Sequence, residues 1–211
     1  ISTPGASLQF TTRAGEPDHF FKNRLSIGAD VQWQTIDEHR VDNLYSREGD
    51  TLRSKEQIKQ SSTGLFVIEK LDIGPKYGLM VCLRYDDIHN ELNDQLKNPY
   101  NLSGNADFSK VTFRFGFTHT PIPEYTLFAS WGQGFLPPAT EELAQNPDQF
   151  GGFNVHLKSA TSEGFELGVR HSPSGQIRYE LTGFFLTTQN DFDRYRISNP
   201  LRNQETFYRN A

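Results

Sequence analysis

One stretch decides the fold class of this 211-residue chain: Lys76–Leu92, which reads Lys-Tyr-Gly-Leu-Met-Val-Cys-Leu-Arg-Tyr-Asp-Asp-Ile-His-Asn-Glu-Leu. Its odd positions from Tyr77 to Tyr85 are all apolar or aromatic, whereas the even positions include Gly78, Arg84 and Asp86. Successive side chains of a strand point to opposite faces, while a helix would mix the two sets on each face. The alternation therefore predicts a long strand with one apolar and one polar face.

The same alternation recurs along the chain and predicts about nine strands. In Asn23–Arg40, for example, Leu25 to Trp33 alternate with Ser26 to Gln34. The expected strands cover about 7–13, 23–40, 61–72, 76–92, 109–120, 125–135, 160–171, 177–189 and 205–211. We expect an all-β fold, an antiparallel up-and-down meander.

The connections between these strands alternate in length. Short turns rich in Pro and Gly are expected at Asp72–Lys76, Pro121–Glu124 and Ser172–Gln176. Long polar loops are expected at Val41–Lys59, Asn93–Phe108, Leu136–Lys158 and Asn190–Glu205, with a helical turn only at Thr140–Ala144. Loops this long are uncommon in compact domains unless they serve a function.

Composition excludes several classes of protein. The longest purely apolar run is Gly64–Ile68, far short of the about 20 residues of a membrane helix. Cys82 is the single cysteine, so a disulfide scaffold is excluded. The net charge of -5 leaves no basic footprint for nucleic acid.

Two interpretations fit the alternation, because a soluble β-sandwich and a membrane β-barrel share its period. Three features favour the barrel. The strands are long, short turns and long loops fall on opposite sides, and aromatic residues stand at both ends of the apolar faces. Those aromatics are Tyr77, Tyr125 and Tyr179 after short turns, and Trp33, Tyr85, Trp131 and Phe135 at the opposite ends.

The polar face carries charges spaced among Gly, Ser and Thr, which suits a hydrated interior. A plain solvated sheet face is the alternative for each residue. The charged residues are Lys70, Arg84, Asp86, Lys110, Arg114, Glu166, Arg170, Arg178 and Glu180.

Several segments resemble the barrel of the TonB-dependent outer-membrane receptors. Leu83-Arg84-Tyr85-Asp86, preceded by a hairpin containing Gly64–Val67 and Leu71–Pro75, is similar to a hairpin of that barrel. The segment Phe128–Pro138, followed by Thr140–Leu143, resembles the family's entry into an extracellular loop. Leu157-Lys158, Glu163–Arg170 and Phe207–Ala211 follow in the family's order, with Ser159-Ala160 where the family has Pro-Glu.

The resemblance implies a plugged barrel of roughly 22 strands in the bacterial outer membrane. Such receptors import scarce nutrients, most often ferric siderophores, with energy from the TonB complex through an N-terminal box. By this comparison, residues 1–211 are a single barrel segment without plug or closing strands, and the chain is a processed product or a fragment. Its expected partners are an iron chelate, outer-membrane lipid and, through regions absent from this chain, the TonB complex.

Ligand capture is the chemistry that the long-loop side can supply. Aromatic rings offer stacking area, and Arg offers planar multidentate contacts to anions. The candidate ligand-binding residues are Tyr45, Arg47, Arg53, Arg84, Asp86, His89, Tyr100, Phe150, Phe153, Arg194 and Tyr195. Generic loop packing is the alternative for each of them.

No catalytic or metal-binding constellation stands out, so we expect no enzyme and no cofactor. The chain lacks His-x-x-x-His and Cys-x-x-Cys pairs, and no triad order is apparent. Asn190, Asp191 and Asp193 could ligate Ca²⁺, although a solvated acidic loop is favoured. A soluble ligand-binding β-sandwich remains the alternative to a transport receptor, and an outer-membrane lipase is the least favoured hypothesis.

Overall fold

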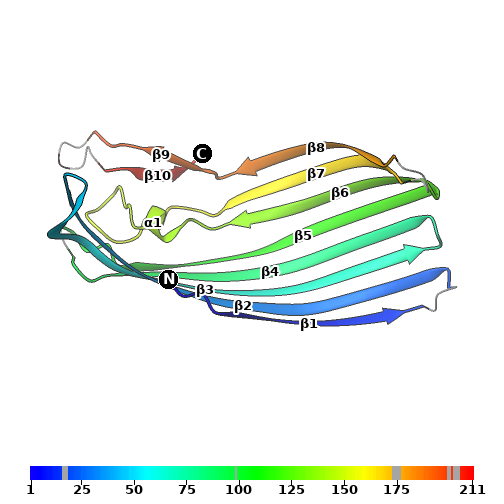
Figure 1. Ribbon diagram of the computed structural model, residues 1–211, viewed down its shortest axis with the longest axis horizontal. Coiled ribbons are helices and arrows are strands. Elements are labelled where there is room, and N and C mark those ends of the chain that lie inside the picture. Colours follow the sequence, from blue (N-terminus) through cyan, green and yellow to red (C-terminus); the bar gives the residue numbers. More distant parts are fainter. Residues whose placement is uncertain (16–18, 98, 173–176, 199–200, 202–204) are drawn as a thin grey trace.

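The computed structural model describes residues 1–15, 19–97, 99–172, 177–198, 201 and 205–211 (Figure 1). Eight strands form one antiparallel sheet in chain order: β1 (Gly5–Ala14), β2 (Phe21–Leu44), β3 (Arg47–Ile73), β4 (Tyr77–Asp94), β5 (Gly104–Ile122), β6 (Tyr125–Leu136), β7 (Ala160–His171) and β8 (Tyr179–Gln189). A second sheet pairs β9 (Phe192–Tyr195) with β10 (Phe207–Asn210), and α1 (Thr140–Leu143) is a single helical turn. The predicted all-β meander and helical turn are confirmed.

The prediction of a long loop at Val41–Lys59 is wrong, because most of these residues extend β2 and β3. β2 and β3 pair from Phe21↔Ile73 to Leu44↔Arg47, with register shifts near Val41. The connection is Tyr45 and Ser46, whose φ angles of 51° and 68° are those of a hairpin turn. The Asn43 side chain accepts a hydrogen bond from the Ser46 N–H, at 2.9 Å. Because this extension is polar on both faces, it lacks the alternation that marks a strand.

The other predicted boundaries also shift. The loop predicted at Asn93–Phe108 is shorter, because Asp94 ends β4 and Gly104 begins β5. The carboxylate of Asp94 organises that loop by accepting hydrogen bonds from the N–H groups of Leu96, Lys97 and Leu102, at 2.9–3.1 Å.

The C-terminal third differs in detail as well. The loop predicted at Asn190–Glu205 contains β9, so the described residues form ten strands where nine were expected. β8 begins at Tyr179. Asn190, with a φ of 55°, separates β8 from β9. The predicted turn Ser172–Gln176 lies, apart from Ser172, outside the described residues.

The apolar sides of the strands form one outward-facing surface, which we call the lipid belt. Register places on it Leu8, Phe10, Leu25, Ile27, Ala29, Val31, Leu65, Val67, Leu71, Leu79, Val81, Leu83, Val111, Phe113, Phe115, Leu127, Ala129, Phe165, Leu167, Val169, Leu181 and Phe185. Leu83 and Phe113 remain 42% and 41% exposed. In the described part of the chain, no second β-layer covers this surface, so the soluble sandwich does not describe this fold.

Aromatic rings gather where the strands meet the short turns. These turns lie at the right of Figure 1. His171 lies between Tyr125 and Tyr179, with ring centroids 4.4 and 4.8 Å away. His119 stacks on Tyr77 at 4.7 Å. At the other end of the belt, Trp131 packs 5.9 Å from Phe115. The rings form two girdles at the levels where a membrane meets water.

Buried apolar side chains gather around α1. This helical turn lies near the opposite end of the sheet (Figure 1). Residues 137–159 fold back with β9 and β10 over the inner face, and we call this assembly the mouth cap. Its core consists of Ile58, Leu92, Leu143, Ala144, Phe153 and Leu157. Asn90, fully buried, donates to the Pro138 carbonyl at 3.4 Å and accepts from Gln60 at 2.7 Å. The cap is thereby fastened to β3 and β4.

Candidate functional site in the inner wall and mouth

The inner face of the sheet is polar and curved. Gln9 of β1 and Gly134 of β6 line the same cavity of about 500 Å³, so the sheet curls around this side. Two phenylalanines on this face each fill the space above a glycine of the next strand: Phe66 beside Gly28, and Phe128 beside Gly168. A Cβ atom at Gly28 would lie 2.3 Å from Phe66, so both positions require glycine.

Arg84 is the centre of a charge network on this wall. Its guanidinium lies 2.8 Å from a carboxylate oxygen of Asp30 and 2.8 Å from one of Asp86. The intervening strand contributes Gly64, where a Cβ would lie 2.0 Å from Arg84 Nη2. Arg84 therefore bridges β2 and β4 only because β3 has no side chain there. The Arg84 guanidinium also lies 5.9 Å from the centre of the Phe66 ring.

Arg114 differs from Arg84 and Arg170 of the same wall. Arg170 pairs with Glu180 at 2.6 Å and lies over Phe128, whereas Arg114 has no hydrogen-bond or ion-pair partner among the described residues. Its side chain lies against Gly132, where a Cβ would be 3.0 Å from Arg114 Cγ. Arg114 is thus a guanidinium beside the cavity that no described carboxylate neutralises.

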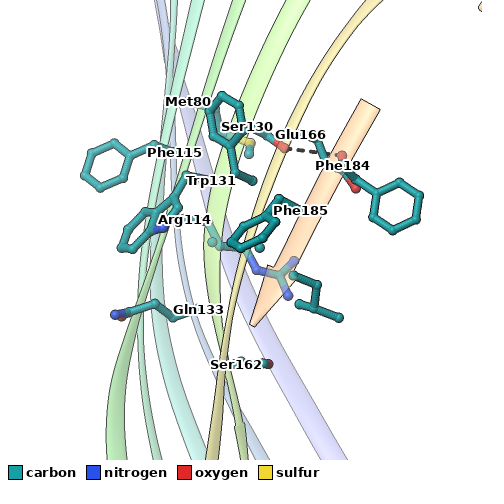
Figure 2. Close-up of a pocket in the computed structure, with 15 residues that line it drawn as sticks. Met80, Arg114, Phe115, Ser130, Trp131, Gln133, Ser162, Glu166, Phe184 and Phe185 are labelled. Carbon is teal, nitrogen blue, oxygen red and sulfur yellow. Dashed lines mark hydrogen bonds between the residues drawn. The ribbon is translucent and has the colours of Figure 1, made fainter. Parts of the chain in front are cut away.

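Figure 2 shows the cavity of about 460 Å³ beside Arg114. Ser130 donates a 3.3 Å hydrogen bond to Glu166, and Phe184 and Leu186 of β8 also line this cavity. Phe184 and Leu186 are 77% and 62% exposed on the inner face. The cavity therefore offers a cation, a carboxylate and apolar surface side by side.

The mouth of the wall holds a third cavity, of about 370 Å³, between the cap and the strand extensions. Arg40, Glu56, Glu141 and Tyr208 are among the residues that line it. Burial raises the pKa of the Glu56 carboxyl, and the neighbouring Arg40 partly offsets that effect. This cavity is acidic, with one arginine at its rim.

The structure brings two pairs of the predicted ligand-binding residues together. Arg84 contacts Asp86, and Tyr100 packs on Phe150 with ring centroids 4.7 Å apart. Gly152 donates to the Asn101 carbonyl at 2.9 Å, which joins the two loops that carry these rings. The Tyr100–Phe150 pair is an aromatic surface at the mouth.

The remaining predicted residues are dispersed. Tyr45, fully exposed, and Arg47 lie at the tip of the β2–β3 hairpin. Arg53 pairs nearby with Asp42 and, through this hydrogen bond, lowers the pKa of the Asp42 carboxyl. His89 lies on the outer face, 2.6 Å from Asp107.

Within the mouth cap, three further predicted residues have distinct places. Phe153 is 5% exposed and forms part of the cap core, so its ring packs rather than facing the mouth. Tyr195 lies under Arg209, whose guanidinium carbon is 5.3 Å from the ring centre. Arg194 is exposed on β9.

Sequence reasoning missed Asp30 and Arg114 as site residues. Both occupy polar-face positions of well-predicted strands, so their side of the sheet was readable. Their partners were not, because the Asp30–Arg84 contact depends on register across three strands. The signal that could have found Arg114 is Gly132, which leaves room beside it.

Neither metal ligation nor a helical membrane crossing is apparent in the described ranges. In those ranges, no three His, Cys, Asp or Glu side chains gather closely enough to hold a metal ion. Likewise, none of the helices described there is long and apolar enough to cross a membrane.

A girdled apolar outer surface and a charged, curved inner surface on one meandering sheet define the wall of an outer-membrane β-barrel. Sequence comparison agrees, because the family model "TonB dependent receptor-like, beta-barrel" matches residues 2–211. The chain belongs to this family and is part of a bacterial outer-membrane protein. The expectation that the chain is not an enzyme is confirmed by that membership.

Solved structures with the same fold include the ferric citrate transporter FecA in its unliganded form, at a TM-score of 0.73 and 13% identity over 89% of this chain. The siderophore receptor PiuA from Acinetobacter baumannii matches 99% of the chain, at a TM-score of 0.69 and 18% identity. The copper transporter OprC also matches 99%, at 0.69 and 17%. These identities establish the fold alone. The chain covers 27%, 33% and 32% of those three proteins.

Proposed function

We propose that this chain is part of the wall and mouth of a receptor that imports a ferric siderophore with energy from the TonB complex. The observation that carries the proposal is the pairing of an aromatic mouth with a charged inner wall on one membrane sheet. Among the similar structures, FecA and PiuA are named for a ferric citrate and a siderophore cargo. OprC, named for copper, defines the competing cargo.

In this proposal the mouth captures the chelate and the inner wall guides its passage. The Tyr100–Phe150 surface supplies stacking area for the ligand. Arg114, unpaired among the described residues, supplies a cation for anionic oxygens of the chelate as it moves inward. Arg84 is already neutralised by Asp30 and Asp86, so its role is to hold the wall together.

The cargo is tested with a deletion strain complemented by the full receptor. Uptake of radioactive iron is measured from citrate, hydroxamate and catecholate chelates, and radioactive copper uptake is measured in parallel. We expect the deletion to abolish uptake of at least one ferric chelate and to leave copper uptake unchanged. Loss of copper uptake alone, or unchanged uptake of every cargo, would refute the proposal.

The division of roles is tested with two substitutions. Tyr100→Ala should weaken binding of the ferric chelate to whole cells, because it removes half of the aromatic surface. Arg114→Gln should slow transport at saturating chelate while binding is unchanged. Equal effects of both substitutions on binding and transport would remove the distinction between capture and passage.

A further inference from the structure

Glu69 lies in the lipid belt, where the residues on either side of it along this face of its strand and directly opposite it on both neighbouring strands are apolar. It lies between Val67 and Leu71 on β3, directly opposite Leu25 of β2 and Val81 of β4. Among the described belt positions between the two girdles, it is the one that carries a carboxylate. A charge facing hydrocarbon destabilises a barrel by an amount that grows with depth, so Glu69 calls for a partner.

The sheet supplies an amide for Glu69 but no cation. The Asn23 side-chain N–H donates to Glu69 Oε1, and Asn23 shares the outer face. Glu69 has no ion pair among the described residues. The neighbouring cations Arg24 and Lys70 occupy the alternate positions of their strands and therefore lie on the inner face. A cation for Glu69 must come from outside the sheet.

The pair lies close to the periplasmic girdle. Glu69 is four residues from Ile73, the last residue of β3 before the short turn. At about 3.3 Å per residue and a strand tilt of about 40°, its Cα is about 10 Å from that end. The bond to Asn23, which pairs with Leu71, directs the carboxylate back toward the turn. The carboxylate therefore faces the level of lipid headgroups.

We propose that Glu69 and Asn23 bind the primary ammonium headgroup of a phospholipid in the periplasmic leaflet. The ammonium donates one hydrogen bond to the Glu69 carboxylate and one to the Asn23 carbonyl oxygen, which the Asn23–Glu69 bond leaves open. The flanking Leu25 and Leu71 side chains contact the acyl chain. This site is independent of the cargo and adds a lipid-binding function to the proposed transport function.

The test uses the purified intact receptor and native mass spectrometry. Phosphatidylethanolamine, phosphatidylcholine and phosphatidylglycerol with identical acyl chains are added in equal amounts. We expect retention of phosphatidylethanolamine about tenfold above phosphatidylcholine, because the quaternary ammonium of the latter cannot donate a hydrogen bond. Glu69→Gln keeps the shape of the side chain and should abolish the preference.

Glu163→Gln is the matched control. Glu163 also lies on the outer face and accepts a 3.1 Å hydrogen bond from an amide, Gln133, but at the opposite end of the belt. Its substitution should leave the preference unchanged. Asn23→Leu should reduce the preference, because the second acceptor is lost. The proposal is overturned if the wild type shows no preference for the primary ammonium, as a protein partner would predict, or if Glu69→Gln keeps it.

Discussion

The two halves of the long strands obey different rules. Between the girdles, the outer positions are apolar and the inner ones mostly polar, and no buried apolar cluster is described there. Beyond Trp33 and Tyr85 the outer face becomes polar, and on the inner face Ile58 and Leu92 join the buried core of the mouth cap. Lipid organises the first half, and packing within the chain organises the second. The same sheet is therefore stable only when one half contacts lipid and the other half contacts water.

The glycines of the wall offer the most severe way to break the membrane half. In Gly168→Val, the Cβ would lie 2.7 Å from the Leu181 carbonyl oxygen and 2.4 Å from the Phe128 ring. The Leu181 carbonyl belongs to the backbone of β8 and cannot move aside for the new side chain. We therefore expect the free energy of unfolding to fall by more than about 3 kcal/mol and no folded receptor to form. Heat-modifiable gel mobility of the intact receptor reports the outcome. Gly164→Ala, whose Cβ would meet Leu186 at an ordinary 3.6 Å, should fold normally.

A charge scan separates the two halves directly. Phe113→Arg places a cation in the belt and should cost about 2–4 kcal/mol in folding into bilayers. Ser109→Arg, four residues along the same face of β5 and opposite Asp87, should cost almost nothing. Equal costs measured by urea titration in liposomes would mean that the belt does not end where the girdles place it.

The cap core should respond as a soluble protein core would. Leu143→Ala removes a side chain that is 1% exposed and should cost about 2–3 kcal/mol locally, because loop neighbours collapse partly onto the gap. Hydrogen exchange of residues 140–157 should accelerate, while exchange in β4 and β5 between the girdles should not change. Faster exchange throughout the sheet would show that the cap supports the wall.

The smallest expected effect concerns Glu56. Burial raises its pKa, so the folded cap holds the proton more tightly than the unfolded one. Stability contributed at this site therefore falls as the pH rises through the raised pKa and is recovered in acid. Glu56→Gln should stabilise the cap at pH 7 by less than about 1 kcal/mol and make no difference in acid. The check is hydrogen exchange at Leu92 in the wild type and in Glu56→Gln, measured at pH 7 and in acid. If the two proteins differ by the same amount at both pH values, the charge of Glu56 does not affect the stability of the cap.

Alternation was enough to predict the membrane half, because only one of its faces meets water. The strands containing Leu79 and Phe113, and the aromatic ends at Tyr77 and Trp131, follow from the sequence for that reason. The hairpin extension beyond Arg40 did not, since two wet faces leave no periodicity to detect.

Only part of the candidate site could be predicted from the sequence, because local patterns do not show which distant residues pair. Arg84 and Asp86 are two residues apart on one strand, so their contact was predictable. Asp30 is 54 residues from Arg84 and reaches it only across Gly64. Phe153 was predicted to be an exposed aromatic residue of the mouth because the residues next to it in the sequence do not indicate a buried core. That core is completed by Ile58 and Leu92, which are distant in the sequence.

The tight turn at Tyr45–Ser46 has a consequence for immunology. From Trp33 to Leu44 the ribbon continues for eleven residues, about 36 Å along the strand. Antibodies that bind this part of the bacterial surface would contact a hydrogen-bonded β-hairpin and not a flexible peptide loop. A vaccine antigen copied from this region should accordingly be a cyclised mimic of the ribbon, whereas a linear peptide of residues 41–59 should elicit sera that bind intact cells poorly.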